Sequence, residues 1–250
     1  MKDILDGIIL GLAQGLTEFL PVSSSGHLVL LERAGIGEPS MLTNLLLHLA
    51  TLLAVLFYYR KSVWEVVRHP LKEKSLFVLT ASVPTAGAAA LVRFVLPDTD
   101  AFLPFFFCVT SVILLLPKIL PPKEGVMQGK VVLPALITGL SQGVACFSGI
   151  SRSGTTTVCL RYVGKGDESA EYSFLLSIPV IIGSSIVEII SSGKNSSVNV
   201  GTVLGMIIAF VTGIIAIRFF EKLLKKDKLH YFSIYTFIMA IVAFLVQIFC

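Results

Sequence analysis

The stretch Gly11–Gly26, GLAQGLTEFLPVSSSG, decides the fold, because the chain contains a second version of it. Residues Gly139–Gly154 read GLSQGVACFSGISRSG and align with the first copy, position by position, without a gap. The two copies share three glycines, one leucine, one glutamine, one phenylalanine and two serines at matching positions. The chain therefore uses the same backbone element twice.

The two copies differ at the positions that carry chemistry. Copy one contributes a carboxylate, Glu18, and an imidazole, His27, where copy two has a cysteine and a threonine. Copy two contributes a guanidinium, Arg152, where copy one has Ser24. These complementary groups predict that the copies are two halves of one site, and that the rest of the chain is a scaffold that brings them together.

The composition identifies the class of protein. Hydrophobic residues make up 54% of the chain, charged residues only 14%, and the mean hydropathy is +0.86, whereas soluble domains are about 25% charged. A membrane-spanning helix needs about 20 mostly apolar residues. Long runs without Asp, Glu, Lys or Arg include Ser75–Val92, Ala101–Pro117, Asn195–Ile217 and Tyr231–Cys250, and Met41–Tyr59 holds only His48. The sequence predicts an all-α polytopic membrane protein. Its net charge of +4 is modest and its basic residues lie in loops, which suits membrane orientation better than nucleic-acid binding.

Each repeated stretch predicts a re-entrant helical hairpin, at residues 4–34 and 131–163. In the first, Pro21 ends a helix, and the next apolar segment is too short to cross a bilayer before Glu32. In the second, Val131–Phe147 enters and Thr155–Val163 returns. Irregular backbone at membrane depth is tolerated only inside protein or a water-filled cavity. Both tips are therefore expected to face inward.

Six spanning helices are predicted around and between the hairpins, at about 41–60, 75–96, 101–118, 170–192, 200–219 and 231–249. Their loops are asymmetric in charge: fifteen lysines and arginines lie on one side, against Lys2, Arg33, Arg93 and Lys194 on the other. The basic side is predicted to be cytoplasmic, which places both termini outside. Three spans separate the hairpins, so the sequence predicts one membrane domain, residues 1–250, with inverted repeats at about 1–120 and 129–250. The site is expected at the midplane between them.

The first tip carries a carboxylate at membrane depth. Gln14 and Glu18 are four residues apart and share a face of one helix. An ionisable group inside the membrane is costly and by default indicates function. A structural ion pair between Glu18 and Arg152 is the alternative, and such a pair could serve both purposes.

Both tips resemble anion sites, because a serine- and glycine-rich turn precedes a short helix in each. The candidate phosphate ligands are Ser23, Ser25 and Gly26 in the first tip and Ser151, Ser153 and Gly154 in the second. Arg152 adds a planar fork suited to phosphate. His27, beside the first tip, is a candidate general acid or nucleophile. His48, within a span, faces either the bundle or the site.

The segments Gln14–His27 and Ser148–Thr156 resemble the two signature motifs of integral-membrane undecaprenyl-pyrophosphate phosphatases of the bacitracin-resistance type. These motifs are Glu/Gln-xxx-Glu with a Ser/His tip, and Pro-Gly-x-Ser-Arg-Ser-x-x-Thr. The resemblance covers nearly the whole chain. Two positions depart from the pattern: Gln14 is the uncharged option at the first acidic position, which leaves one carboxylate for a metal, and Ser148 replaces the proline.

The resemblance implies hydrolysis of undecaprenyl pyrophosphate to undecaprenyl phosphate at the outer face of a bacterial plasma membrane, a step that recycles the lipid carrier for cell-wall synthesis. It implies a divalent cation, Mg²⁺ or Ca²⁺, at Glu18 and Gln14, and a prenyl pyrophosphate lipid and the bilayer as partners. The positions carried over are Gln14, Glu18, Ser23, Ser24, His27, Ser151, Arg152 and Thr156, with Glu18, Ser24, His27 and Arg152 as catalytic residues. The sequence does not choose between Ser24 and His27 as the attacking group. It also leaves open the oligomeric state, a homodimer included, and an alternative function as a lipid flippase or anion transporter.

Overall fold

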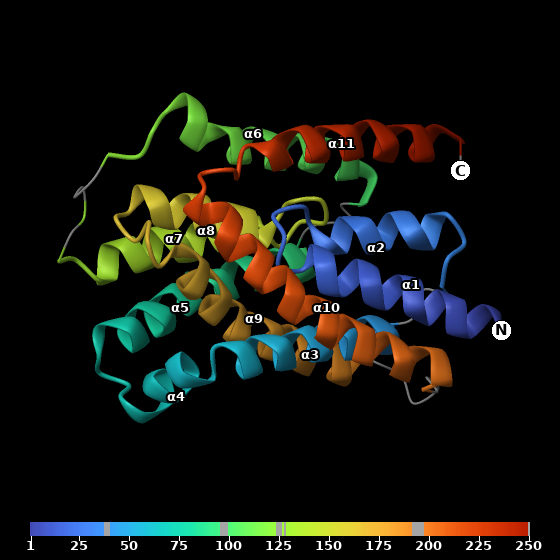
Figure 1. The fold of residues 1–250 in the computed structure, drawn as a ribbon, viewed down its shortest axis with the longest axis horizontal. Coiled ribbons are helices and arrows are strands. Elements are labelled where there is room, and N and C mark those ends of the chain that lie inside the picture. The colour runs from blue at the N-terminus through green and yellow to red at the C-terminus, as the bar shows by residue number, and fades with distance from the viewer. Residues whose placement is uncertain (38–40, 96–99, 124–126, 128, 192–197, 250) are drawn as a thin grey trace.

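The computed structural model describes residues 1–37, 41–95, 100–123, 127, 129–191 and 198–249, and this part of the chain is helical without strands (Figure 1). Six of its helices are long and apolar enough to cross a membrane. They are α3 (Met41–Tyr58), α5 (Glu73–Val95), α6 (Leu103–Ile119, after the 3-10 turn Asp100–Phe102), α9 (Ser169–Ser191), α10 (Val200–Lys225) and α11 (Tyr231–Phe249). The predicted all-α class with six membrane-spanning helices is confirmed.

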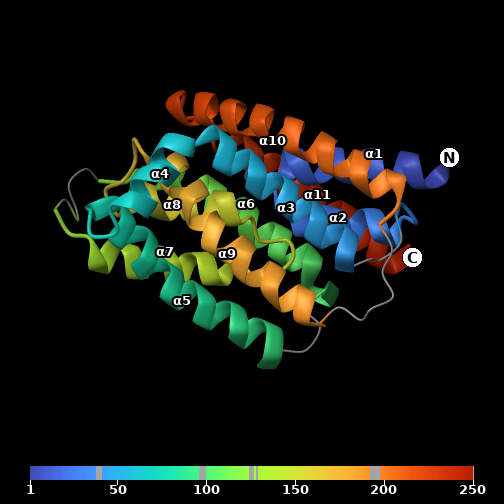
Figure 2. The same cartoon turned by 90° about the horizontal axis from the view of Figure 1, so that it is seen from below.

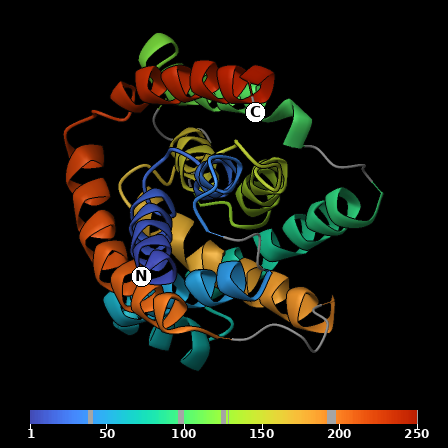
Figure 3. The same cartoon turned by 90° about the vertical axis from the view of Figure 1, so that its right-hand side faces the viewer.

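The repeated stretches form two helical hairpins. The first consists of α1 (Lys2–Thr17) and α2 (Ser24–Arg33), and the second of α7 (Val132–Val144) and α8 (Arg152–Tyr162). The hairpins come from opposite ends of the molecule and their tips meet in the middle (Figure 1). Viewed along the long axis, the tips lie inside a ring of the long helices (Figure 3). At 10, 13 and 11 residues, α2, α7 and α8 are shorter than a spanning helix. Re-entry into a bilayer stays a prediction.

Each hairpin packs its outer helix against a long helix from the other half of the chain. α1 lies along α10, and α7 lies along α5. Equivalent glycines make both contacts close. A Cβ on Gly11 would lie 2.4 Å from the carbonyl oxygen of Gly205, and one on Gly139 would lie 2.1 Å from that of Ala81. Small residues at such contacts let membrane helices approach closely. Because each hairpin packs on a helix of the other half, the two halves of the chain form one bundle.

One helix was not predicted. α4 (Arg60–Arg68) lies in a region that the sequence analysis assigns to a basic loop. It is too short to leave a pattern beside the long apolar runs, and it buries none of its side chains. Trp64 and Val67 are 61% and 67% exposed. α4 therefore has an apolar surface outside the spanning helices.

The predicted basic side corresponds to one end of the molecule. α4, the start of α5 and the end of α10 lie at that end, whereas α1 begins and α11 ends at the other (Figure 2). This arrangement agrees with an even number of crossings between the termini. Lys194 lies outside the described residues, and the assignment of the two ends to cytoplasm and exterior stays a prediction.

Candidate functional site

Both hairpin tips are capped helix N-termini. The Ser23 hydroxyl oxygen accepts from the backbone N–H of Gly26 at 3.4 Å and caps α2. Its equivalent, Ser151, accepts from Gly154 at 3.1 Å and caps α8. Ser23 also has a positive φ of 68°, a left-handed conformation that is uncommon for a residue with a Cβ and marks a constrained turn. The serines thus satisfy one free donor at each helix start.

The two tips interlock. The backbone N–H of Gly149, in the second tip, donates to the Ser23 hydroxyl at 3.1 Å. In return, the Ser153 hydroxyl donates to the carbonyl of Leu20 at 3.0 Å. A Cβ on Gly26 would lie 3.1 Å from the Cα of Gly149, so the glycine permits this close approach. The predicted meeting of the two copies is therefore present in the structure.

Glu18 lies at the junction of the tips, directly after α1, and is only 6% exposed. Its Oε1 forms an ion pair with Arg152 of the second tip. Its Oε2 accepts from the Ser24 hydroxyl at 2.5 Å and from Gln14 Nε2 at 3.1 Å. One carboxylate therefore contacts the guanidinium, a serine hydroxyl and an amide at once.

His48 faces the site rather than the bundle. Its Nδ1 lies 3.0 Å from Gln14 Nε2 and 3.7 Å from Glu18 Oε2. Because the Gln14 amide nitrogen can only donate, Nδ1 is the acceptor in that contact. α3 therefore adds an imidazole to the carboxylate cluster. The only signal of this in the sequence is a polar residue within an otherwise uncharged span.

His27 is engaged away from the carboxylate. Its Nδ1 lies 2.7 Å from the carbonyl oxygen of Ser23, and its Nε2 lies 2.7 Å from the hydroxyl of Tyr235 on α11. The structure thus brings Ser24, Glu18 and Arg152 into one contact group and places His27 beside it. Tyr235 was not predicted as a site residue, since no motif surrounds it.

The remaining candidate phosphate ligands surround this group. The hydroxyls of Ser23 and Ser25 are 3.4 Å apart, and those of Ser151 and Ser153 are 3.3 Å apart. Thr156 differs from them. Its fully buried hydroxyl donates to the carbonyl of Arg152 at 2.7 Å and contacts the Ser173 hydroxyl. It joins α8 to α9, and direct contacts of any of these residues with phosphate stay predictions.

Residues 7–242 match the protein family described as "Bacitracin resistance protein BacA". The chain belongs to this family. An undecaprenyl-diphosphatase of Korarchaeum cryptofilum is 35% identical to it, over 96% of this chain and 97% of that protein. One of Thermosipho melanesiensis is 37% identical, over 95% and 97%. The undecaprenyl-diphosphatase 1 of Shouchella clausii is 34% identical, over 98% and 96%. The matched residues contain both tips, every candidate residue and five of the six spanning helices, and they reach into α11.

The resemblance implies a divalent cation at Glu18 and Gln14. Whether these residues could bind one depends on the oxygen atoms that they offer. Gln14 Oε1 is buried and has no hydrogen-bond partner in the described part of the chain. Together with Glu18 it offers oxygen ligands of the kind that Mg²⁺ and Ca²⁺ prefer. Among the described residues no group of three His, Cys, Asp or Glu could hold a metal by itself. The residues therefore fit a cation that takes its other ligands from phosphate and water.

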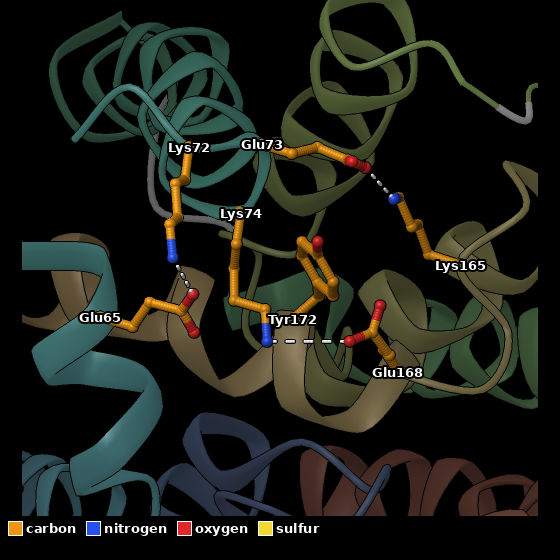
Figure 4. Close-up of a pocket in the computed structure, with 7 residues that line it drawn as sticks. All are labelled: Glu65, Lys72, Glu73, Lys74, Lys165, Glu168 and Tyr172. Carbon is orange, nitrogen blue, oxygen red and sulfur yellow. Dashed lines mark hydrogen bonds and ion pairs between the residues drawn. The ribbon is translucent and has the colours of Figure 1, made fainter. Parts of the chain in front are cut away.

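A separate charged cavity of about 440 Å³ lies at the predicted cytoplasmic end (Figure 4). It is lined by Glu65, Lys72, Glu73, Lys74, Lys165, Glu168 and Tyr172. Its lysines are paired: Lys72 donates to Glu65 at 3.1 Å, Lys74 lies 3.7 Å from Glu168, and Lys165 pairs with Glu73. The hydrogen bond from Lys72 holds the pKa of Glu65 below its usual value. These pairs connect the α4–α5 and α8–α9 corners, and none of the lining residues belongs to a tip.

Proposed function

We propose that the chain is an undecaprenyl pyrophosphate phosphatase, which hydrolyses a prenyl pyrophosphate to the prenyl monophosphate and orthophosphate. The observation that carries the proposal is the 2.5 Å hydrogen bond from Ser24 to Glu18, at a carboxylate that Arg152 also contacts. A hydroxyl that donates to a carboxylate is arranged as an activated nucleophile. The names of the relatives from three organisms support the same substrate.

Phosphate binding falls to the two tips. The N-termini of α2 and α8 meet there, and each presents backbone N–H groups and the positive end of a helix dipole to an anion. Arg152 has five N–H donors, of which the pair with Glu18 uses only part. The remaining donors suit a phosphate, which a guanidinium binds in a planar two-pronged manner. Arg152 thus holds the substrate beside Glu18 and Ser24.

The chemical step starts at Ser24, which the geometry favours over His27. The Ser24 oxygen attacks the terminal phosphorus, and its proton passes to Glu18. The bond between that phosphorus and the bridging oxygen breaks, and the bridging oxygen leaves with the prenyl monophosphate. Positioning and charge stabilisation supply most of the catalysis in phosphoryl transfer. Arg152 and the two helix N-termini provide both.

The second step releases orthophosphate from the phosphorylated serine. A water molecule attacks the phosphorus and gives its proton to His27, while Glu18 returns its proton to the Ser24 oxygen. A divalent cation held by Glu18 and Gln14 would neutralise charge on the pyrophosphate. His48, 3.0 Å from the Gln14 amide, orients that side chain. His27 then gives its proton to the departing orthophosphate, which restores the site after one hydrolysis.

In the membrane, the two hairpins are re-entrant and belong to inverted repeats, and the site opens to the outer face. Three observations support this arrangement: the short tip helices, the equivalent contacts of Gly11 and Gly139 with helices of the opposite half, and the basic residues gathered at one end. The prenyl chain remains in the bilayer while the pyrophosphate reaches the tips. The protein is then a multi-pass enzyme of the plasma membrane.

The test is orthophosphate release by the purified protein in detergent, with a short-chain prenyl pyrophosphate as substrate. We expect turnover that is lost in Ser24→Ala and retained in Ser62→Ala, a serine of α4 far from the tips in the chain. Detergent removes the two compartments that a flippase or transporter needs. Absence of phosphate release from the folded wild-type protein would contradict the proposal and favour a transport function.

A further inference from the structure

Tyr235 contacts His27 although the two residues are 208 positions apart in the chain. The tyrosine hydroxyl lies 2.7 Å from Nε2, and the two rings are parallel within 2°. The His27 ring also packs edge-on against Phe107 of α6, with ring centroids 5.7 Å apart. His27 is therefore held by side chains from α6 and α11, neither of which belongs to a hairpin.

The two hydrogen bonds of His27 fix its tautomer. The partner of Nδ1 is the backbone carbonyl of Ser23, which can only accept, so Nδ1 carries the proton. In the neutral ring Nε2 is then unprotonated, and the Tyr235 hydroxyl donates to it. A hydroxyl can also accept, so Tyr235 can rotate its O–H and remain a partner after Nε2 takes up a proton. The Tyr235 hydroxyl can therefore hydrogen-bond to Nε2 in both protonation states of that nitrogen.

Packing alone does not explain the hydroxyl of Tyr235. The residue is 42% exposed on a membrane-spanning helix, where its neighbours Ile234, Phe237 and Ile238 are exposed and wholly apolar. A polar group in apolar surroundings is costly unless it is hydrogen-bonded. Phenylalanine would supply the same ring without that cost. His27 is the hydrogen-bond partner that accounts for a tyrosine at this position.

The helix that carries Tyr235 is fixed relative to the tips. The Ser111 hydroxyl of α6 donates to the backbone carbonyl of Ser233 at 2.7 Å, two residues before Tyr235. Thr110, the preceding residue of α6, accepts from the N–H of Ser151 at 3.0 Å and donates to the carbonyl of Gly149 at 2.8 Å. One short segment of α6 therefore connects the second tip to α11. These hydrogen bonds hold α11, and with it Tyr235, in place beside His27.

We propose that Tyr235 is a proton relay for the phosphatase reaction: its O–H occupies the lone pair of His27 Nε2, so the tyrosine oxygen takes up the proton of the attacking water while its own proton passes to Nε2. This inference rests on the proposed function, and it assigns a role to a residue of α11 in the second half of the chain. It predicts a defect in the chemical step when the hydroxyl is removed, with the ring and the substrate site left in place.

The kinetic test compares Tyr235→Phe with Tyr231→Phe, which removes a hydroxyl one turn earlier on the same helix. The Tyr231 ring is 57% exposed and packs beside His230. General acid–base groups contribute about 10²–10⁴-fold, and loss of the partner of such a group should lower kcat about tenfold. We expect KM to change less than about twofold in Tyr235→Phe, and Tyr231→Phe to match the wild type. An equal loss in both variants would overturn the proposal.

A double variant separates the proton relay from a general effect of the tyrosine on packing. In the His27→Ala background, Tyr235→Phe should lower kcat by less than about twofold, because residues that act as a unit are not additive. A further tenfold loss in that background would show that Tyr235 acts without His27 and would overturn the proposal. Thermal unfolding of both single variants should match the wild type.

A spectroscopic readout is independent of turnover. Nitrogen NMR of protein labelled with ¹⁵N-histidine in micelles should show His27 with Nδ1 protonated in the wild type, the assignment being made by loss of the signal in His27→Ala. In Tyr235→Phe the Nε2 signal should shift because it loses its hydrogen bond, with Nδ1 still protonated on the Ser23 carbonyl, while Tyr231→Phe should match the wild type. A wild-type His27 with Nε2 protonated, or an unchanged spectrum in Tyr235→Phe, would overturn the proposal. Failure of every variant to release phosphate, with these spectra as expected, would contradict only the proposed function.

Discussion

Glu18 and Arg152, 134 residues apart in the chain, form an ion pair between the tips of two hairpins whose sequences repeat one another. In the alignment of the repeats, Cys146 occupies the position of Glu18, and Ser24 occupies that of Arg152. The repeated backbone therefore requires neither charge, since each copy forms its tip without one of them. The pair exists only where the two copies meet, which accounts for a duplicated motif with different functional residues.

The first prediction concerns Glu18. Glu18→Gln keeps the shape of the side chain but removes the charge that accepts the Ser24 proton and contacts Arg152. We expect turnover to fall by about 10²–10⁴-fold, the range for a lost general base, while the protein still inserts and folds. The control is Glu221→Gln, which alters a carboxylate of α10 that the hydroxyls of Tyr58 and Tyr59 contact. Near-normal phosphate release from Glu18→Gln would make the Glu18 pair purely structural.

The second prediction identifies the attacking group. If Ser24 is the nucleophile, a rapid acid quench during turnover should trap phosphate on serine, because serine phosphate esters survive acid and phosphohistidine does not. We expect the trapped phosphate at Ser24, located by peptide mapping, and no trapped phosphate in Ser24→Ala. His27→Ala should accumulate the phosphorylated enzyme, since it slows the second step. An acid-labile phosphoenzyme that disappears in His27→Ala would assign the attack to His27 instead.

The third prediction concerns the packing of hairpins on the opposite half of the chain. Gly11→Ala and Gly139→Ala each place a methyl group against a backbone carbonyl, at 2.4 and 2.1 Å. Overpacking of this kind costs about 1–3 kcal/mol, so both variants should unfold at lower temperature in detergent. Gly87→Ala, a helical position with nothing within 4 Å of the new Cβ, should be neutral or slightly stabilised. Equal unfolding temperatures for all three would contradict the close helix contacts.

Much of the fold follows from the sequence because membrane helices depend on length and apolar composition. The six predicted spans agree closely with the observed helices; the span predicted at 231–249, for example, is α11 (Tyr231–Phe249). The meeting of the tips was predictable for a different reason: the repeat assigns complementary charges, Glu18 and Arg152, to equivalent turns. Both features leave a pattern that can be read along the chain.

The contacts of single polar residues within apolar helices leave no such pattern. A lone histidine or tyrosine in an apolar run has no periodicity that shows which face points inward, so the approach of His48 to Glu18 and of Tyr235 to His27 required the structure. The same holds for Thr156, whose motif position does not reveal that its hydroxyl is used between α8 and α9. α4 was missed because nine residues between two spans resemble a basic loop.

The fourth prediction concerns orientation. Trp64, the only tryptophan, lies on exposed α4 at the basic end of the molecule, and tryptophans are enriched at membrane–water interfaces. In vesicles of known orientation, aqueous iodide should quench its fluorescence only from the cytoplasmic side, and lipids brominated near the headgroup should quench it strongly. In the variant that combines Trp64→Phe with Phe249→Trp, the tryptophan moves to the opposite end, and iodide should quench from the outside. Quenching of Trp64 from the outside would invert the proposed topology.

The central claim is that two copies of one motif form one phosphate site, and Arg152 tests it most directly. Its repeat partner is Ser24, and a guanidinium at membrane depth costs about 2.5–3.5 kcal/mol on insertion scales, so an anion that it binds is the simplest reason for its presence. Arg152→Lys keeps the charge but loses the planar fork, and it should lose most activity.

The decisive measurement is orthophosphate release by purified Arg152→Ala, compared with wild type and with Arg161→Ala. Arg161 lies on the same helix and pairs with Asp227 at 2.7 Å, so it controls for loss of an arginine from α8. The account predicts a loss on the order of 10³-fold for Arg152→Ala, as for other arginines that stabilise a transferring phosphoryl group, with Arg161→Ala near wild type. Retention of about a third of wild-type turnover by Arg152→Ala would contradict the shared phosphate site.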